Sequence, residues 1–256
     1  MSLPRLLPCG NFYETPDGTF PRVTSVLKTL GKPWLEKWEA ALEREMVTEA
    51  AIKLYEDLPP QGPKMSNLTF SMTLKQRIGK ERAAEKARQT ALDVGTRVHK
   101  LIEWELRREL GVKVGKAPAV SGEAANAFAQ YRAWRDSVHL APVAVEQTVW
   151  HKHDGHAGTL DLLSRVDGEL AVVDFKTSKA VYPDYFLQNA SYMASVNFMG
   201  KTLEPVTRGF TVRLPKRAGD GFEVRETERP ADVYEVFRHL LSVWKWAQST
   251  KEVPQC

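Results

Sequence analysis

The feature that most constrains the fold of this chain is a change of hydrophobic period between residues 143 and 177. Here Val, Leu and aromatic residues form three short runs, a composition and spacing typical of β-strands. The runs are VAVEQTVW (143–150), GTLDLLSRV (158–166) and ELAVVDFKT (169–177). Asp154-Gly155 and Asp167-Gly168 stand between them, and Asp-Gly is a strong hairpin signal. The sequence therefore predicts an antiparallel meander of three strands.

Segments with helical spacing surround this meander. We expect helices at 75–110, 121–137, 184–199 and 230–249, and strands near 205–213 and 221–227. The order helix, three strands, helix, strand predicts an α/β fold in which helices flank one mixed sheet. We divide the chain into an N-terminal helical and loop extension, residues 1–74, and a core, residues 75–256, that ends in the C-terminal helix. Residues 57–73 contain three prolines and are expected to form a loop.

The second turn of the meander decides which side chains face each other. If Asp167-Gly168 is a two-residue loop, Val166 pairs with Glu169, and the same register places Asp161 opposite Asp174. The two Cα atoms of such a non-hydrogen-bonded pair approach to ~4.5 Å. Carboxylates that close repel each other unless a cation lies between them. This register therefore predicts a site for a hard divalent ion such as Mg²⁺ or Mn²⁺.

Lys176 follows Asp174 by two residues, so it points to the same side of the sheet, opposite Thr159. An ammonium next to a bound cation can orient water or stabilise charge on a phosphate, which suits the hydrolysis of phosphate esters. Asp and Lys on a strand usually belong to a solvated face. Here the strand is otherwise apolar and the neighbouring strand supplies a second carboxylate, so we favour a functional site.

Composition excludes several other classes of protein. No run approaches the ~20 apolar residues that cross a bilayer, and the N-terminus does not resemble a signal peptide. We therefore expect a cytoplasmic protein, or one in the host cytoplasm if it is viral, with no membrane partner. Two cysteines, Cys9 and Cys256, are too few for an iron–sulfur cluster. The net charge of +4 is compatible with a polyanionic partner but does not require one.

These residues also resemble a known family. GTLDLL (158–163) and VVDFKTS (172–178) are similar to the core motifs of the PD-(D/E)XK nuclease superfamily. GTRVHKLIE (95–103) resembles the G-x-x-x-H helix of its RecB-like branch, and QNASY (188–192) resembles the Q-x-x-x-Y motif of that branch. The motifs occur in the family's order over roughly residues 84–215. The resemblance implies a restriction-endonuclease-like core, αβββαβ, and nuclease activity that depends on Mg²⁺ or Mn²⁺.

Carried over by position, the resemblance implies a catalytic set of His99, Asp161, Asp174 and Lys176, in which the first three and the backbone carbonyl of Phe175 bind the metal. Gln188 and Tyr192 lie one helical turn apart and would touch the DNA backbone or Lys176. Gly95 would let a strand or a phosphate come close. The residues expected to support the site or bind nucleic acid are Gly95, Thr96, Glu103, Thr159, Thr177, Gln188 and Tyr192.

The N-terminal segment narrows the kind of nuclease. PRVTSVLKTLGKPWLEKWEAALERE (21–45) resembles phage-encoded members and mitochondrial genome maintenance exonucleases of this branch, and the chain lacks a helicase G-x-x-x-x-G-K-[ST] loop. This implies a DNA exonuclease acting on single-stranded or end-exposed DNA, with phage or host recombination or replication proteins as partners. Two alternatives stay open: a structure-specific flap endonuclease of the same fold, and an inactive nucleic-acid-binding or recombination accessory module.

Several other residues leave alternatives open. Glu103 could support His99 or a second cation, or it could be a solvated ion-paired residue. Glu146 shares the Asp161 face if Asp154-Gly155 is a two-residue loop, whereas a bulge would reverse it. His151, His153 and His156 cluster at that turn, where histidines without function are the commoner case. Basic residues expected to form an electrostatic track, diluted by Glu81 and Glu85, are Lys75, Arg77, Lys80, Arg82, Lys86 and Arg88.

Overall fold

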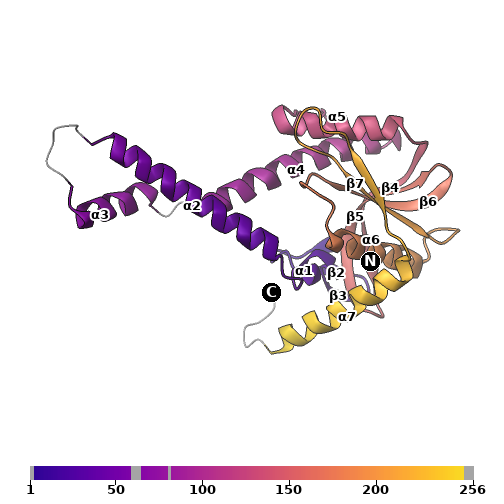
Figure 1. Ribbon diagram of the computed structural model, residues 1–256. Helices are drawn as coiled ribbons and strands as arrows, with labels where there is room; N and C mark the ends of the chain where they lie inside the picture. Colours follow the sequence, from indigo (N-terminus) through magenta and orange to yellow (C-terminus); the bar gives the residue numbers. More distant parts are fainter. Residues whose placement is uncertain (1–2, 59–64, 80–81, 251–256) are drawn as a thin grey trace. The chain divides into compact units, whose positions relative to one another are not determined.

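The computed structural model describes residues 3–58, 65–79 and 82–250, and Figure 1 labels its helices and strands. The chain divides into two compact units: one is residues 31–93, and the other joins residues 1–30 to residues 94–256. This division differs from the boundary at residue 74 that we expected, because the first 30 residues belong to the unit of the large sheet. Within the described ranges, no helix combines the length and apolar character that a bilayer crossing requires.

The smaller unit is helical and contains α2 (Pro33–Glu56), α3 (Asn67–Ile78) and the start of α4 (Ala83–Glu109). The expected loop over 57–73 is wrong for its last part. Ser66 caps α3, since its Oγ accepts the Thr69 N–H at 3.1 Å, and this cap starts a helix within the predicted loop. The expected continuous helix over 75–110 is also wrong, because Gly79 ends α3 with a φ of 61°, a conformation that favours glycine.

The basic track expected in this unit is partly neutralised by neighbouring carboxylates. Arg77 Nη2 lies 2.5 Å from Asp57 Oδ2, and Arg88 pairs with Glu39. Lys80 and Glu81 lie outside the described residues. Arg77 and Arg88 are therefore ion-paired within the chain, and the electrostatic track stays a prediction.

The larger unit contains two sheets and the helices that cover them. Its elements are β1 (Arg5–Leu6), β2 (Phe12–Thr15), β3 (Gly18–Pro21), α1 (Val23–Leu27), the rest of α4, α5 (Gly122–Asp136), β4 (Leu140–His151), β5 (His156–Val166), β6 (Glu169–Lys176), α6 (Pro183–Met199), β7 (Arg208–Arg213), β8 (Glu223–Glu226) and α7 (Pro230–Ser249). The small sheet β1-β2-β3 was not predicted, because strands of two to four residues are too short to show alternation.

The larger sheet has the order β4-β5-β6-β7-β8, which confirms an α/β fold with one mixed sheet. The strands β4, β5 and β6 form the predicted antiparallel meander. The next strand, β7, runs parallel to β6 and is reached through α6, and β8 pairs antiparallel to β7 at the edge. The predicted three-strand meander and the helix that follows it are therefore present.

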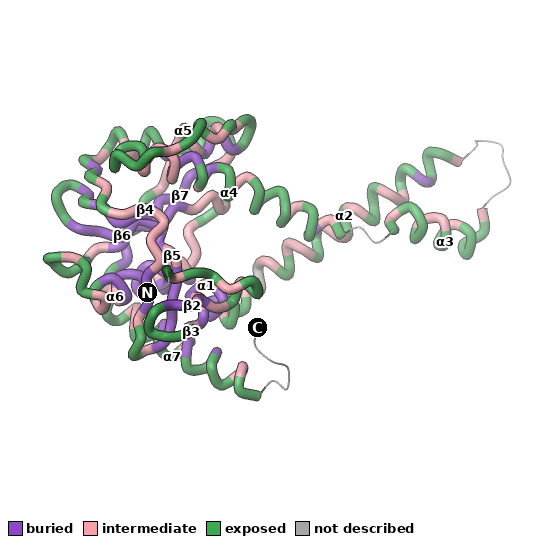
Figure 2. Tube along the Cα trace, turned by 180° about the vertical axis from the view of Figure 1, so that it is seen from behind, coloured by how far each residue is buried: buried purple, intermediate pink, exposed green. Residues whose placement is uncertain are grey.

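Helices cover both faces of this sheet (Figure 1). On one face Leu170 and Val172 pack with residues of α1, α6 and α7, among them Tyr192. On the other face Val173 and Phe175 pack with residues of α4 and α5. Figure 2 shows the buried residues gathered along the central strands and α6. Because side chains alternate along β6, Asp174 belongs to the face of Leu170 and Val172.

The small N-terminal sheet packs against β5. Arg22 forms an isolated parallel bridge with Ala157, and Tyr13 packs with Trp150 and Ala157. The Tyr13 hydroxyl lies 2.9 Å from Thr159 Oγ1. The first residues of the chain therefore support the strand that carries Asp161.

Candidate functional site

The turn between β4 and β5 sets the position of Glu146. Strand pairing ends at His151 and His156, so four residues form the turn. This is two more than in the two-residue loop that Asp154-Gly155 could have formed. In the resulting register Val145 pairs with Leu162 and Gln147 pairs with Leu160, which leaves Glu146 and Asp161 opposite each other and outside the ladder. Glu146 has a φ of 48°, which is uncommon for a residue with a Cβ. The strand is thus irregular where the two carboxylates meet.

The predicted register of β5 and β6 is confirmed, since Val166 pairs with Glu169 and the ladder continues to Leu162 and Val173. Asp167 and Gly168 both have positive φ, as a two-residue type I′ loop requires. The ladder stops one position before Asp161 and Asp174. There the Phe175 N–H donates to Asp161 Oδ2 at 2.8 Å. The backbone of β6 therefore holds the Asp161 carboxylate in place.

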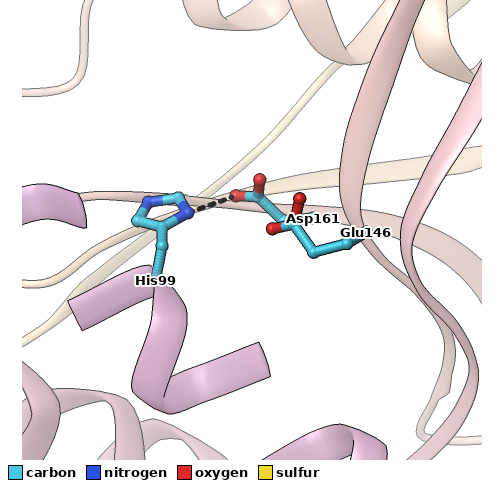
Figure 3. A group of neighbouring side chains, drawn as sticks. All are labelled: His99, Glu146 and Asp161. Carbon is cyan, nitrogen blue, oxygen red and sulfur yellow. Dashed lines mark ion pairs between the residues drawn. The ribbon is translucent and has the colours of Figure 1, made fainter. Parts of the chain in front are cut away.

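Three side chains from three elements converge at this irregularity. His99 of α4, Glu146 of β4 and Asp161 of β5 each offer a ligand atom, and these atoms lie within 4.8 Å of one another. Figure 3 shows the imidazole of His99 facing the Asp161 carboxylate, with Nδ1 3.6 Å from Oδ2. The His99 side chain is 30% exposed and that of Asp161 15%, so the group is open to solvent.

Asp174 has other partners. Its Oδ1 accepts Gln188 Nε2 at 3.0 Å, and its Oδ2 lies 2.5 Å from Lys176 Nζ in an ion pair without hydrogen-bond geometry. From the sequence we expected Asp174 to bind the metal together with His99 and Asp161. In the structure, the third residue whose ligand atom lies close to those of His99 and Asp161 is Glu146. The expected roles of Asp174 and the Phe175 carbonyl as ligands stay predictions.

The charges of the site shift several pKa values. Burial lowers the pKa of His99, but the Asp161 carboxylate outweighs burial and raises it to about 9. Burial, and then repulsion by Asp161, raise the pKa of Glu146 to about 7. Burial likewise raises the pKa of Asp174 to about 6, against the attraction of Lys176. Burial would raise the pKa of Asp161 as well, yet His99 and Lys176 hold it below its usual value.

Gln188 and Tyr192 extend the site into α6. Gln188 Nε2 also donates to the Tyr192 hydroxyl at 3.2 Å, and both side chains are buried. We expected them to touch DNA or Lys176, whereas Gln188 contacts the carboxylate of Asp174. Tyr192 packs against Gly158, where an added Cβ would lie 2.5 Å from the Tyr192 ring. This close approach explains the glycine near the start of β5, which the sequence reasoning missed.

The remaining support residues have varied surroundings. Thr177 Oγ1 lies 3.1 Å from the place of a Cβ on Gly95, so a side chain of this protein uses the space that we expected to admit a strand or phosphate. Glu103 forms an ion pair with Arg107 at 2.8 Å, which agrees with the second of the two alternatives for this residue. Thr159 contacts Tyr13 and, at 3.4 Å, Thr148 Oγ1. The remaining support residue, Thr96, is exposed.

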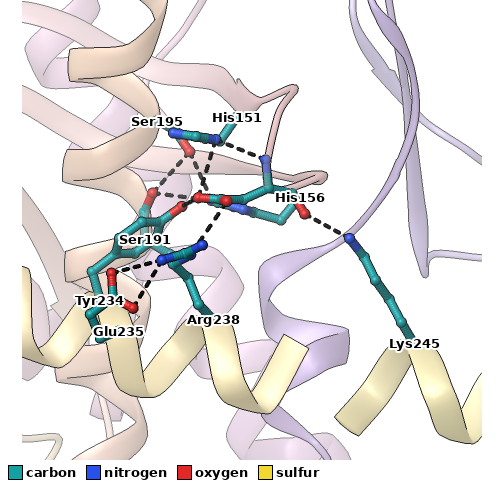
Figure 4. Close-up of polar contacts among 9 residues, drawn as sticks. His151, His156, Ser191, Ser195, Tyr234, Glu235, Arg238 and Lys245 are labelled. Atoms are coloured by element: carbon teal, nitrogen blue, oxygen red, sulfur yellow. Dashed lines mark hydrogen bonds and ion pairs between the residues drawn. The ribbon is translucent and has the colours of Figure 1, made fainter. Parts of the chain in front are cut away.

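The histidines of the β4–β5 turn form a different kind of cluster (Figure 4). His156 is fully buried, and its Nε2 lies 3.1 Å from Ser195 Oγ. His151 Nδ1 lies 3.4 Å from Asp154 Oδ2, a carboxylate that also accepts the Tyr234 hydroxyl at 2.6 Å. Among the described residues, these histidines are not part of a group whose ligand atoms converge. The network instead ties the turn to α6 and α7.

The group of His99, Glu146 and Asp161 fits a hard divalent cation. Two carboxylates and one imidazole suit such an ion, and the exposure of the site lets water complete its coordination. Burial is the larger cause of the raised pKa of Glu146 and repulsion by Asp161 is the second, and a cation between the two carboxylates would relieve that repulsion. No model of a known protein family matches the chain, and no curated protein matches it.

Proposed function

We propose that this chain is a metal-dependent DNA exonuclease of the PD-(D/E)XK type, with a restriction-endonuclease-like αβββαβ core in its larger unit. The observation that carries the proposal is the convergence of His99, Glu146 and Asp161 next to the strand that bears Asp174 and Lys176. A solvated surface gives no reason to bring two carboxylates together at a strained point of a sheet, because the charge of Asp161 raises the pKa of Glu146.

Mg²⁺ or Mn²⁺ would be held by His99, Glu146 and Asp161, with Asp174 as the further ligand that the family resemblance implies. When bound, such an ion would acidify water and neutralise charge on a phosphate oxygen. The chain holds the Asp161 carboxylate for this task through the Phe175 N–H. It holds the Asp174 carboxylate through Gln188, which in turn donates to Tyr192.

Lys176 is the proposed catalytic lysine. Its side chain is 18% exposed, so most of it is covered by the protein and the rest is in contact with solvent. Burial would lower its pKa, but Asp174 and Asp161 raise it, so Lys176 carries a proton at neutral pH. A charged ammonium beside two carboxylates can attract a phosphate oxygen and stabilise the charge that develops on it.

End-labelled oligonucleotides with Mg²⁺ or Mn²⁺ test the proposal. We expect the wild-type protein to degrade linear single strands and leave circular single strands intact, because an exonuclease needs an end. Lys176→Ala should abolish cleavage while DNA binding stays within a few-fold of wild type, since a single charge contributes modestly to binding. Glu204→Gln is the matched control, because it removes an exposed carboxylate that pairs with Arg165.

Each other outcome of this assay identifies a different activity. Cleavage of circular strands or preferred cleavage at flap junctions would make the protein an endonuclease. Binding of DNA without cleavage of any substrate, at equal protein concentration and with either metal, would overturn the proposal in favour of an accessory binding module. Cleavage by Lys176→Ala at the wild-type rate would show that the nuclease activity comes from elsewhere.

A further inference from the structure

Two groups hold Lys176, and one of them has no assigned role in the site. Lys176 Nζ lies 2.5 Å from Asp174 Oδ2. It also lies over the ring of Tyr185, 5.0 Å from the ring centre. Since 18% of the Lys176 side chain is exposed, the ammonium has lost much of its hydration. The face of an aromatic ring carries negative charge density and can replace part of that hydration.

Tyr185 belongs to the same helical face as the other residues of α6 that reach the site. Tyr185, Gln188 and Tyr192 are spaced three and four residues apart, which places them on one side of a helix. Gln188 donates to the carboxylate of Asp174, and Tyr185 covers the ammonium of Lys176. One face of α6 therefore contacts both members of the ion pair.

The ring of Tyr185 is itself fixed by its neighbours. Tyr185 lies in the first turn of α6, two residues after Pro183, and its N–H donates to the Tyr182 carbonyl at 3.0 Å. The Tyr182 ring packs edge-on against it, with 5.6 Å between the ring centres and 78° between the planes. A half-buried ring held in this way offers a defined surface to the ammonium.

We propose that Tyr185 is a positioning residue for Lys176, whose ring face fixes the ammonium at the place from which it acts on the phosphate. An ammonium held by its carboxylate alone follows that carboxylate when it turns. The ring is a second anchor that does not depend on the orientation of Asp174. The effect of Tyr185 on catalysis rests on the proposed nuclease function. The contact between the Tyr185 ring and the Lys176 ammonium is present in the chain without metal.

Two substitutions separate the ring from the rest of the side chain. Tyr185→Phe keeps the ring and removes the hydroxyl, and Tyr185→Leu keeps apolar volume and removes the ring. Phe128→Leu is the matched control, because Phe128 carries Arg132 over its ring at 5.1 Å on α5. Two readouts apply to each variant: the NMR shift of the Lys176 ε-protons in metal-free protein, assigned with Lys176→Arg, and kcat and KM on a linear single strand.

We expect the Lys176 ε-protons of wild type and Tyr185→Phe to be shifted upfield by the ring, and this shift to be lost in Tyr185→Leu. In Tyr185→Leu kcat should fall roughly tenfold, the equivalent of a partly desolvated cation–π contact, while KM changes little. Tyr185→Phe and Phe128→Leu should keep kcat within about twofold of wild type, because neither removes the ring beside Lys176.

An unshifted Lys176 resonance in the wild-type protein would overturn the inference, even if Tyr185→Leu fails to fold. A wild-type kcat in a folded Tyr185→Leu variant would overturn it as well. If the wild-type protein cleaves nothing, the proposed nuclease function fails, and the NMR shift alone still decides whether the ring holds the ammonium.

Discussion

Two histidines of the larger unit have pKa values shifted in opposite directions. His156, at the start of β5, is fully buried beside Ser195, and burial lowers its pKa to about 3. His99, on α4, is partly exposed next to Asp161, and that carboxylate raises its pKa to about 9 against the effect of burial. Burial lowers the pKa of both imidazoles, and only at His99 does a neighbouring carboxylate, that of Asp161, outweigh it.

The two neighbourhoods also differ in what their carboxylates do. Near His156, Asp154 is already bonded by Tyr234 and paired with Arg238 at 3.3 Å, so the cluster is closed on itself (Figure 4). Near His99, Asp161 faces a second carboxylate, Glu146, across an irregular pair of strands (Figure 3). The first arrangement anchors a turn, and the second is suited to a cation.

The largest expected effect comes from removing the carboxylate beside His99. Asp161→Asn should weaken binding of Mn²⁺ by at least ~100-fold and reduce cleavage by roughly 1,000-fold, because a ligand and its charge are lost. The pKa of His99 should fall from about 9 toward the value that burial favours, so that His99 comes to resemble His156. Calorimetric Mn²⁺ titration and an NMR pH titration measure the two effects. Unchanged Mn²⁺ affinity would remove Asp161 from the cation site.

Gly158 lies on β5 between His156 and Asp161, and its substitution should disturb the candidate site through Tyr192 and Gln188, which holds Asp174. In Gly158→Ala the new Cβ would lie 2.5 Å from the Tyr192 ring, which must move and take Gln188 with it. We expect a loss of about 2–3 kcal/mol in the free energy of unfolding and of roughly 10- to 100-fold in kcat. Urea denaturation and steady-state cleavage provide the measurements.

Gly209→Ala is the matched control for this substitution. There the new Cβ would lie 2.7 Å from Met193 Sδ, the flexible end of a neighbouring α6 side chain that can turn away. The free energy of unfolding of Gly209→Ala should fall by less than that of Gly158→Ala, and its kcat should stay at the wild-type value. If both variants lose kcat equally, the contact between Gly158 and Tyr192 has no special part in the site.

His156 predicts a pH dependence of stability that His99 does not share. Its pKa in the folded chain, about 3, is below the ordinary value of 6.5, so the unfolded chain takes up the proton first as the pH falls. The stability is fully present above pH 6.5 and decreases below it by about 1.4 kcal/mol per pH unit. Urea titrations of the metal-free protein at pH 7, 6 and 5 should therefore show a smaller loss in His156→Asn. Parallel curves for the two proteins would contradict the assignment.

The smallest effect is expected at Glu146, where function and stability oppose each other. Its φ of 48° is strained for a residue with a Cβ, so Glu146→Gly should stabilise the metal-free protein by about 1 kcal/mol while weakening Mn²⁺ binding. Glu146→Ala loses the carboxylate but keeps the Cβ, and it should lack the gain from the backbone. Equal stability of the two variants would show that the backbone stores no strain there.

The part of the site that local rules specify was predictable from the sequence. Asp167-Gly168 demands a two-residue loop, and this loop fixes the register that brings Asp161 near Asp174. The alternation along β6 then places Lys176 on the side of Asp174, as the ion pair confirms. The helices expected at 184–199 and 230–249 from helical spacing also match α6 and α7 to within one residue.

Features that depend on tertiary contacts were not predictable. The residue opposite Glu146 depends on how many residues form the β4–β5 turn: a two-residue loop would place Leu163 there, whereas the four-residue turn places Asp161 there, and Asp154-Gly155 is compatible with either. Tyr185 and Gly158 act through packing between α6 and the sheet, for which the sequence has no periodic signal. The packing of β2 and β3 against β5 joins residues far apart in the chain, and strands this short show no alternation.

The anomalous scattering of Mn²⁺ in crystals of the wild-type protein tests the cation site most directly. We predict a peak about 2.2 Å from a ring nitrogen of His99 and from carboxylate oxygens of Glu146 and Asp161. A peak at the His151 and His156 turn instead, or no peak at a saturating Mn²⁺ concentration, would contradict the account.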